Sequence, residues 1–276
     1  RRSDWLPALN LAYRIRRDRQ LRFSYYQALG RPNYGNFRPQ VDLPLIPLDQ
    51  FNSSNQALEF TNSNNLDLTY ERYGKRDGLL TVGLYYKAID RPTVRRAVTQ
   101  NNALTFTYLT QLVNTDAASV FGLETGIYQS LGAIDERWRH FNVNATYNLN
   151  FLSSQGGEGL PNATPLAQAP RQSANLSVVY ANPKKRLNLV VAMNYRDRFF
   201  DRFLDQWAVW RNNLFSLDIS ADYEVFKNVS VFVRANNLTD HPFEEWLGEP
   251  NASSSNLRSK ASYGSWGLLG VRFSAR

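Results

Sequence analysis

The sequence predicts an all-β fold: an antiparallel transmembrane β-barrel, to which this chain contributes about eleven strands. Three observations predict it. Apolar and polar residues alternate with a period of two along most of the chain, short and long connections alternate between the patterned segments, and aromatic residues gather at both ends of the apolar faces. No stretch approaches the roughly 18 uninterrupted apolar residues of a membrane-spanning helix, so strands are expected to cross the membrane.

The composition excludes several classes of protein. Aromatic residues make up 13% of the 276 residues, which is too many for a disordered chain. The absence of cysteine excludes a disulfide scaffold, a thiolate metal site and a cysteine nucleophile. A net charge of +8 fits nucleic acid, an anionic membrane surface or scattered exposed arginines. Nucleic acid is not expected as a partner, because the aromatic residues alternate with Asn and acidic residues instead of lying beside Lys and Arg.

The clearest strand lies at residues 141–150. Its apolar residues are Phe141, Val143, Ala145, Tyr147 and Leu149, and the polar residues between them are Asn142, Asn144, Thr146, Asn148 and Asn150. On a strand these ten residues form two opposite faces, whereas on a helix they would scatter around the whole cylinder.

The same alternation predicts the other strands in chain order. They lie at residues 9–16, 21–25, 66–71, 80–87, 121–127, 176–180, 187–195, 215–223, 229–233 and 263–273. Several approach the roughly 9–11 residues that a tilted strand needs to cross a bilayer.

The connections alternate in length. Short turns are expected at residues 17–20, 74–78, 132–137, 182–186 and 226–228, and long loops at 32–65, 91–117, 152–172, 200–214 and 239–260. Residues Thr105–Asn114 could form a strand of their own, but counting them as a membrane span would break the short–long order, so they are assigned to the second long loop. Outer-membrane barrels have short periplasmic turns and long external loops, whereas nothing in a soluble sandwich requires all long loops to lie at one end.

The aromatic residues sort by height along the strands. If the short turns are periplasmic, one belt near them contains Tyr13, Tyr70, Tyr180, Tyr223 and Phe273, and an opposite belt contains Tyr86, Phe121, Tyr147, Tyr195, Phe215 and Tyr263. Two aromatic belts that flank an aliphatic band are expected at the two membrane interfaces.

Six short motifs carry a resemblance to a known family. They lie at residues 5–14, 31–35, 68–73 with 84–87, 113–114 with 120–124, 231–240 and 267–273; examples are Trp-Leu-Pro-Ala-Leu-Asn-Leu from residue 5 and Ala-Asn-Asn-Leu-Thr-Asp from residue 235. Each motif alone is common, but all six follow one order along nearly the whole chain. The sequence therefore resembles the C-terminal half of the β-barrel of a TonB-dependent outer-membrane receptor.

The resemblance implies a 22-stranded barrel with a plugged lumen. Residues 1–276 would be its C-terminal portion, without the plug domain and the N-terminal strands. The implied function is TonB-energised uptake of a scarce nutrient (a siderophore, oligosaccharide, peptide or similar) across the outer membrane of a Gram-negative bacterium. The implied partners are the rest of the barrel and its plug, a TonB-type energising protein, lipopolysaccharide and phospholipid, and an outer-membrane lipoprotein.

Two other functions stay open: an autotransporter-type translocator or passive channel, and the structural barrel of a larger outer-membrane assembly. A translocator should have an even, self-closing set of strands and a helix in the lumen, and no helical segment is evident before Leu9. No enzyme, metal site or cofactor is expected. The two histidines, His140 and His241, are far apart in sequence, and the chain has no His-Glu-x-x-His, phosphate-loop or Gly-x-Ser-x-Gly motif.

Substrate contacts are expected from the lumen and the loops. The lumenal candidates are Lys87, Asn148, Asn150 and Arg196, and the loop candidates are Trp207, Trp210, Arg211 and Trp246. Aromatic faces stack on sugars or ring systems, and arginines bind carboxylate or phosphate through two hydrogen bonds. The alternatives are contacts with water or the plug for the lumenal residues, and packing between loops or contacts with lipopolysaccharide for the loop residues.

Overall fold

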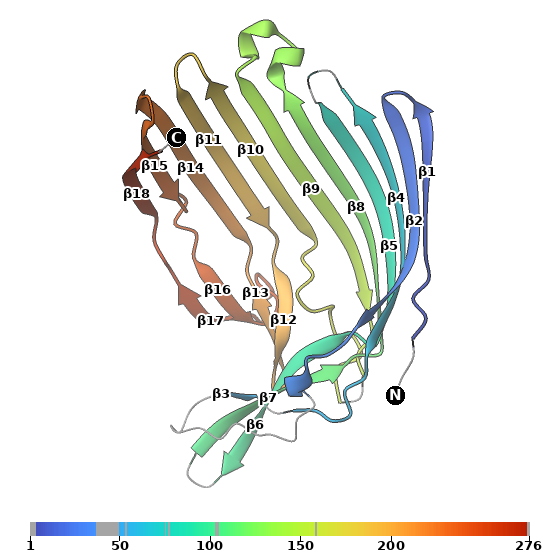
Figure 1. Cartoon of the computed structure of the whole chain (residues 1–276). Helices are drawn as coiled ribbons and strands as arrows, with labels where there is room; N and C mark the ends of the chain where they lie inside the picture. Colours follow the sequence, from blue (N-terminus) through green and yellow to red (C-terminus); the bar gives the residue numbers. More distant parts are fainter. Residues whose placement is uncertain are drawn as a thin grey trace.

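A computed structural model describes residues 4–36, 50–52, 54–74, 76, 78–102, 105–157 and 159–274 (Figure 1). Its larger element, here called the barrel wall, is a curved antiparallel sheet in the strand order β1-β2-β4-β5-β8-β9-β10-β11-β14-β15-β18. The strands are β1 (Ala8–Arg16), β2 (Arg19–Gly30), β4 (Thr61–Tyr73), β5 (Leu79–Asp90), β8 (Ala117–Ser130), β9 (Phe141–Ser154), β10 (Gln172–Asn182), β11 (Leu187–Arg196), β14 (Leu214–Phe226), β15 (Val229–Asn236) and β18 (Trp266–Phe273).

Each of the eleven predicted segments overlaps one strand of the barrel wall, so the all-β, antiparallel fold is confirmed. The last strand begins at Trp266, so Tyr263, which the sequence analysis placed in that strand, lies just before it. The wall is not closed: β1 and β18 form its two edges, as expected for part of a larger barrel. The short connections lie together at one end of the wall, the upper end in Figure 1, and the long ones lie at the other end. The short β8–β9 connection contains two 3₁₀ turns, η2 (Leu131–Ala133) and η3 (Glu136–Trp138). In the part of the chain that the structure describes, no helix is long and apolar enough to cross a membrane.

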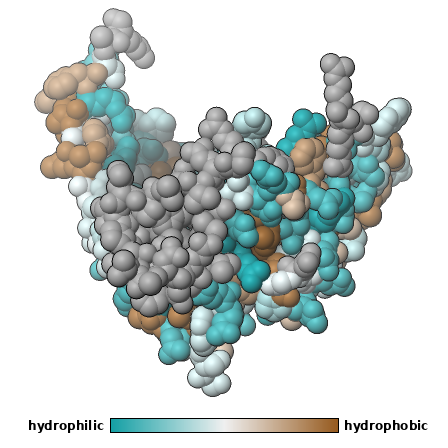
Figure 2. Space-filling model, turned by 90° about the horizontal axis from the view of Figure 1, so that it is seen from below, coloured by the Kyte–Doolittle hydropathy of each residue, from teal (hydrophilic) through white to brown (hydrophobic). Residues whose placement is uncertain are grey.

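The barrel wall has two different faces, because successive residues of a strand point to opposite sides. In β5 the exposed side chains are Leu80, Val82, Leu84 and Tyr86, whereas Thr81, Gly83, Tyr85 and Lys87 between them are half-buried. Register partners share a face, so the apolar face continues from Leu84 to Leu68 of β4 and Leu123 of β8. Hydrophobic residues accordingly remain at the surface (Figure 2). A soluble sandwich would bury such a face against a second sheet.

One hydrogen-bonded row links the two predicted aromatic belts. It runs from Tyr13 through Leu21, Tyr70, Val82, Thr125, Tyr147, Ala174 and Tyr195 to Phe215. Its eight steps of about 4.8 Å span about 38 Å across the wall. At a strand tilt of about 40° such a row climbs about 25 Å, which is the height of a barrel's apolar band. With this usual tilt, the register is compatible with Tyr13 near one interface and Phe215 near the other, which stays a prediction.

Strands from four of the five long loops form a second sheet, here called the loop sheet, with the strand order β17-β16-β13-β12-β6-β7-β3. Its strands are β3 (Gln50–Asn52), β6 (Thr93–Asn102), β7 (Thr105–Asn114), β12 (Phe199–Leu204), β13 (Trp207–Arg211), β16 (Phe243–Leu247) and β17 (Asn256–Ala261). Residues Thr105–Asn114 are thus a strand outside the barrel wall, in the second long loop as the sequence predicts. The union of the loops in one sheet was not predicted from the sequence. It depends on three pairings between strands of different loops: β13 with β16, β12 with β6 and β3 with β7.

The hydrophobic core of the described residues lies in the loop sheet. Val94, Phe200 and Phe203 form one buried cluster, and Ala97, Leu204 and Val209 form another. Phe200 is 1% exposed and Val209 is 0% exposed. The loop sheet is therefore a packed unit, and it sits at the long-loop end of the barrel wall (Figure 1).

Candidate ligand-binding site

Three of the four predicted lumenal residues gather around one tyrosine. Tyr85 extends from the polar face of β5, and its hydroxyl donates a short hydrogen bond to Oδ1 of Asn150. The amide of Asn148 donates to the same hydroxyl at 3.1 Å. The ammonium group of Lys87 lies 5.2 Å from the centre of the Tyr85 ring. The polar face at β5 and β9 therefore offers a cation, a phenol and two amides side by side.

The Tyr85 ring depends on a glycine beneath it. A Cβ atom at Gly122 of β8 would lie 2.1 Å from the ring carbon Cζ of Tyr85, so no larger residue fits there without moving the ring. Tyr85 itself was not singled out from the sequence. The signal was present in the Tyr85-Tyr86 pair, because two successive strand residues point to opposite faces and one of them must face the lumen.

Arg196 lies near this cluster but separately from it. In the register of the sheet, Asn148 of β9 is opposite Ser173 of β10, which is opposite Arg196 of β11. The guanidinium group of Arg196 stacks over the Phe199 ring at 4.7 Å, and its buried Nε has no hydrogen-bond partner among the described residues. Arg196 thus stands between the lumenal cluster and the loop sheet.

The loop tryptophans have different environments. Trp210 of β13 is half-buried, with its ring 6.1 Å from that of Phe200 in an edge-on arrangement. Trp246 is opposite Trp210 in the register of the sheet, and its Nε1 donates to Glu244 at 3.2 Å. Trp207 remains 45% exposed. Packing within the loop sheet therefore involves Trp210 and Trp246, and Trp207 offers a free aromatic surface.

Arg211 belongs to an ion-pair cluster centred on Glu245. Arg211 lies 2.8 Å from Glu245 and 3.4 Å from Asp201, and Glu245 also pairs with Arg202 at 3.2 Å and closely with Arg258. Glu245 is 8% exposed. Burial raises the pKa of the Glu245 carboxyl, but the charges and hydrogen bonds of the surrounding arginines outweigh this effect and hold the pKa below its usual range. The cluster stabilises the loop sheet, with Arg211 as one of its members.

A cavity of about 230 Å³ lies where the barrel wall meets the loop sheet. Its lining includes Leu152 of β9, the aromatic rings of Phe200 and Trp210, and the charged residues Arg171, Arg198 and Glu249. Arg198 pairs with Glu249 at 3.0 Å, and the side chain of Arg171 is exposed. Aromatic faces next to guanidinium groups suit a ligand with rings and negative charge.

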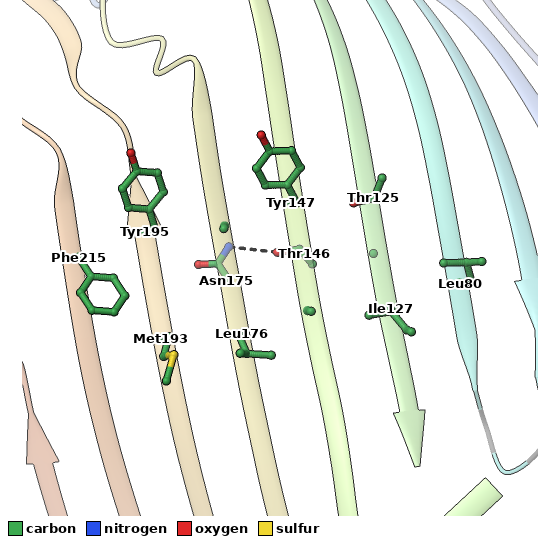
Figure 3. A pocket seen from close by; sticks show the side chains of 13 residues that line it. Leu80, Thr125, Ile127, Thr146, Tyr147, Asn175, Leu176, Met193, Tyr195 and Phe215 are labelled. Atoms are coloured by element: carbon green, nitrogen blue, oxygen red, sulfur yellow. Dashed lines mark hydrogen bonds between the residues drawn. The ribbon is translucent and has the colours of Figure 1, made fainter. Parts of the chain in front are cut away.

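Another hollow, of about 520 Å³, is a different kind of surface. It lies on the apolar face of the barrel wall, where Leu80, Ile127, Met193 and Phe215 line it (Figure 3). Ala145 is another of its lining residues. Almost no polar atoms line it, so it suits hydrocarbon better than a polar nutrient. Among the described residues, acidic and histidine side chains form no group of three that could hold a metal ion.

Solved structures with the same fold are outer-membrane receptors. The siderophore receptor PirA from Acinetobacter baumannii matches with a TM-score of 0.63 at 14% identity, over 98% of this chain and 41% of that one. The ferric-catecholate import receptor Fiu from E. coli K12 matches with a TM-score of 0.63 at 13% identity, over 96% and 34%. A mutant of the ferric enterobactin receptor PfeA from Pseudomonas aeruginosa, in complex with enterobactin, matches with a TM-score of 0.60 at 16% identity, over 87% and 36%. The chain thus spans about two fifths or less of the length of these receptors.

The sequence itself matches one protein family. A search of curated proteins found no significant match. The family model described as "TonB dependent receptor-like, beta-barrel" matches residues 1–238, which is most of the chain. Members of this family are receptors and transporters of the Gram-negative outer membrane and are not enzymes. The chain therefore belongs to the TonB-dependent receptor family and forms part of its β-barrel.

Proposed function

We propose that this chain forms the later half of the barrel of an outer-membrane receptor that imports a scarce nutrient with energy from a TonB-type protein. Ferric siderophores are the first class of ligand to test, because the similar solved structures are siderophore and ferric enterobactin receptors. The observation that carries the proposal is the two-faced barrel wall, whose polar face meets a packed loop sheet at one end. Such a wall suits a gated path for a polar ligand through a membrane.

The rest of the same barrel is the proposed partner of the two edge strands. With eleven strands, β1 and β18 run in the same direction, so they cannot pair with each other in an antiparallel sheet. Unpaired backbone groups in lipid cost several kcal/mol each. Further strands would complete a barrel of about 22 strands around a plug domain. Contacts with lipopolysaccharide and an outer-membrane lipoprotein belong to the same proposal.

Ligand contacts are proposed at the junction of the barrel wall and the loop sheet. Lys87, Asn148 and Asn150 would contact the ligand from the lumenal cluster, with Arg196 beside them. Trp207 offers its exposed ring, whereas Trp210, Arg211 and Trp246 would act mainly by holding the loop sheet in place.

Growth under iron limitation tests the proposal. A strain that lacks the gene should lose uptake of one ferric siderophore, with ferric enterobactin as the first probe, and the wild-type gene should restore it. The Lys87→Gln and Trp207→Ala variants should weaken ligand binding while the protein stays in the outer membrane. Uptake that persists after removal of the TonB-type protein would point to a passive channel. Unchanged uptake of every nutrient tested in the deletion strain would contradict the proposal.

A further inference from the structure

We propose that the barrel wall carries a binding site for an anionic glycerophospholipid on its apolar face, at the end with the short turns. A groove of about 480 Å³ lies there between the β4–β5 turn, the end of β8 and η2. Its lining includes Arg72, Gly78, Leu80, Ile127, Gln129 and Ile134. The inference rests on the proposed orientation in the membrane, in which the short turns face the periplasm.

The groove is held in shape by contacts between two turns. Arg76 of the β4–β5 turn donates to Glu136 of η3 at 2.6 Å, and Arg139 donates to the same carboxylate at 3.2 Å. A Cβ atom at Gly132 would lie 2.4 Å from Nη1 of Arg76, and one at Gly78 would lie 2.4 Å from Oε1 of Gln129. The two glycines thus let the turns approach closely, so the walls of the groove are preformed.

Among the residues that the structure describes, no carboxylate pairs with the cation at the groove. Arg72 is exposed on the apolar face, opposite Leu80 in the register of the sheet, and its side chain makes no ion pair or hydrogen bond with any described residue. By contrast, Arg22 and Arg234 on the lumenal face pair with Glu71 at 3.1 Å and Asp222 at 2.8 Å. An arginine at a membrane interface whose side chain forms no ion pair with the described residues is suited to a lipid phosphate, which it can bind through two hydrogen bonds.

A second arginine lies beside Arg72 but is itself paired. Arg19 of β2 is opposite Arg72 in the register of the sheet and forms an ion pair with Asp18 at 3.5 Å. Because Asp18 offsets the charge of Arg19, an anionic headgroup would interact mainly with Arg72.

The apolar wall of the groove fits acyl chains. Leu80, Ile127 and Ile134 line it, and Ile134 is 78% exposed although it lies in a turn. Leu80 and Ile127 also line the 520 Å³ hollow, which extends along the same face toward the long-loop end (Figure 3). A lipid with its phosphate at Arg72 could therefore lay its chains along a continuous apolar track. The periplasmic leaflet contains phospholipid, so phospholipid is the proposed ligand and lipopolysaccharide is not.

Native mass spectrometry of the intact protein with added phosphatidylglycerol tests the site. The wild type should bind at least one phosphatidylglycerol more tightly than phosphatidylcholine. Arg72→Gln should weaken this binding about tenfold, as expected for a lost charged hydrogen-bond donor. Arg137→Gln is the matched control, because it removes the same charge. The side chain of Arg137 is 89% exposed and does not line the groove. The control should change binding less than about twofold.

Several results would overturn the site. Equal weakening by Arg72→Gln and Arg137→Gln would show only general attraction to anionic lipid. Equal binding of phosphatidylcholine, or displacement of phosphatidylglycerol by lipopolysaccharide, would also contradict it. The test is independent of the nutrient: Arg72→Gln should leave uptake unchanged, so a failed uptake assay and a failed lipid assay are distinguishable.

Discussion

The replacement Glu245→Gln should loosen the loop sheet without unfolding the barrel wall. Glu245 is 8% exposed and faces Arg202, Arg211 and Arg258. Removing one partner of a buried ion pair costs about 3–5 kcal/mol. Asp201 still pairs with Arg202 and Arg211 in the variant, so we expect the lower end of this range. A cost of about 3 kcal/mol corresponds to an opening constant about 150-fold larger.

Amide hydrogen exchange measures this change. Peptides from β13 and β16 should exchange about 150-fold faster in the variant, and peptides from β9 in the barrel wall should not change. Glu249→Gln is the matched control: it removes the same charge from an exposed pair with Arg198, whose side chain is 36% exposed, and should cost less than about 1 kcal/mol. Unchanged exchange in β13 and β16, or equal acceleration in β9, would refute the reasoning.

Three further predictions concern the same two regions. The pKa of Glu245 is depressed in the folded protein, so its ion pairs stabilise the loop sheet above its ordinary pKa of 4.5. This stability is lost as the pH falls through the lower folded-state pKa. Amide exchange in β16 should therefore accelerate in that acidic range, and exchange in β9 should stay slow. Phe200→Ala should cost about 3–5 kcal/mol through a cavity in the loop sheet, measured by the same exchange, with Trp207→Ala nearly neutral as an exposed control. Gly122→Val should displace the Tyr85 ring and change its fluorescence or NMR signals, whereas Gly35→Val, with open space around it, should not.

The barrel wall could be predicted because its signal is local. A strand such as β9 shows its two faces within ten successive residues, and the hydrogen-bonding partners are neighbours in the sequence. The alternation of short and long connections also placed Thr105–Asn114 outside the wall without any knowledge of its pairing.

The loop sheet could not be predicted, because its pairing joins distant residues. The parallel contact between Arg202 and Arg95 has no signature in either segment. The cluster around Glu245 depends on another long-range pairing, that of β13 with β16, because Arg202, Arg211 and Arg258 come from three different strands. The spacing of residues in the sequence does not predict which of these distant strands pair.

The candidate site, too, could be predicted from the sequence only in part. Period-two alternation was enough to place Lys87, Asn148 and Asn150 on one face, and the structure brings them together around Tyr85. It places Trp207 and Trp210 on opposite faces of one strand, but it does not tell which of the two faces is packed. Trp210 packs against Phe200, whereas Trp207 stays 45% exposed.

The central claim is that the barrel wall turns its apolar face to lipid and its polar face to the lumen. The chain has no cysteine, so single spin labels can be attached at six successive positions, from Val143→Cys to Asn148→Cys. Collision rates with membrane-dissolved oxygen should be high at Val143, Ala145 and Tyr147 and low at Asn144, Thr146 and Asn148. Rates without this period of two, or with the opposite phase, would contradict the account.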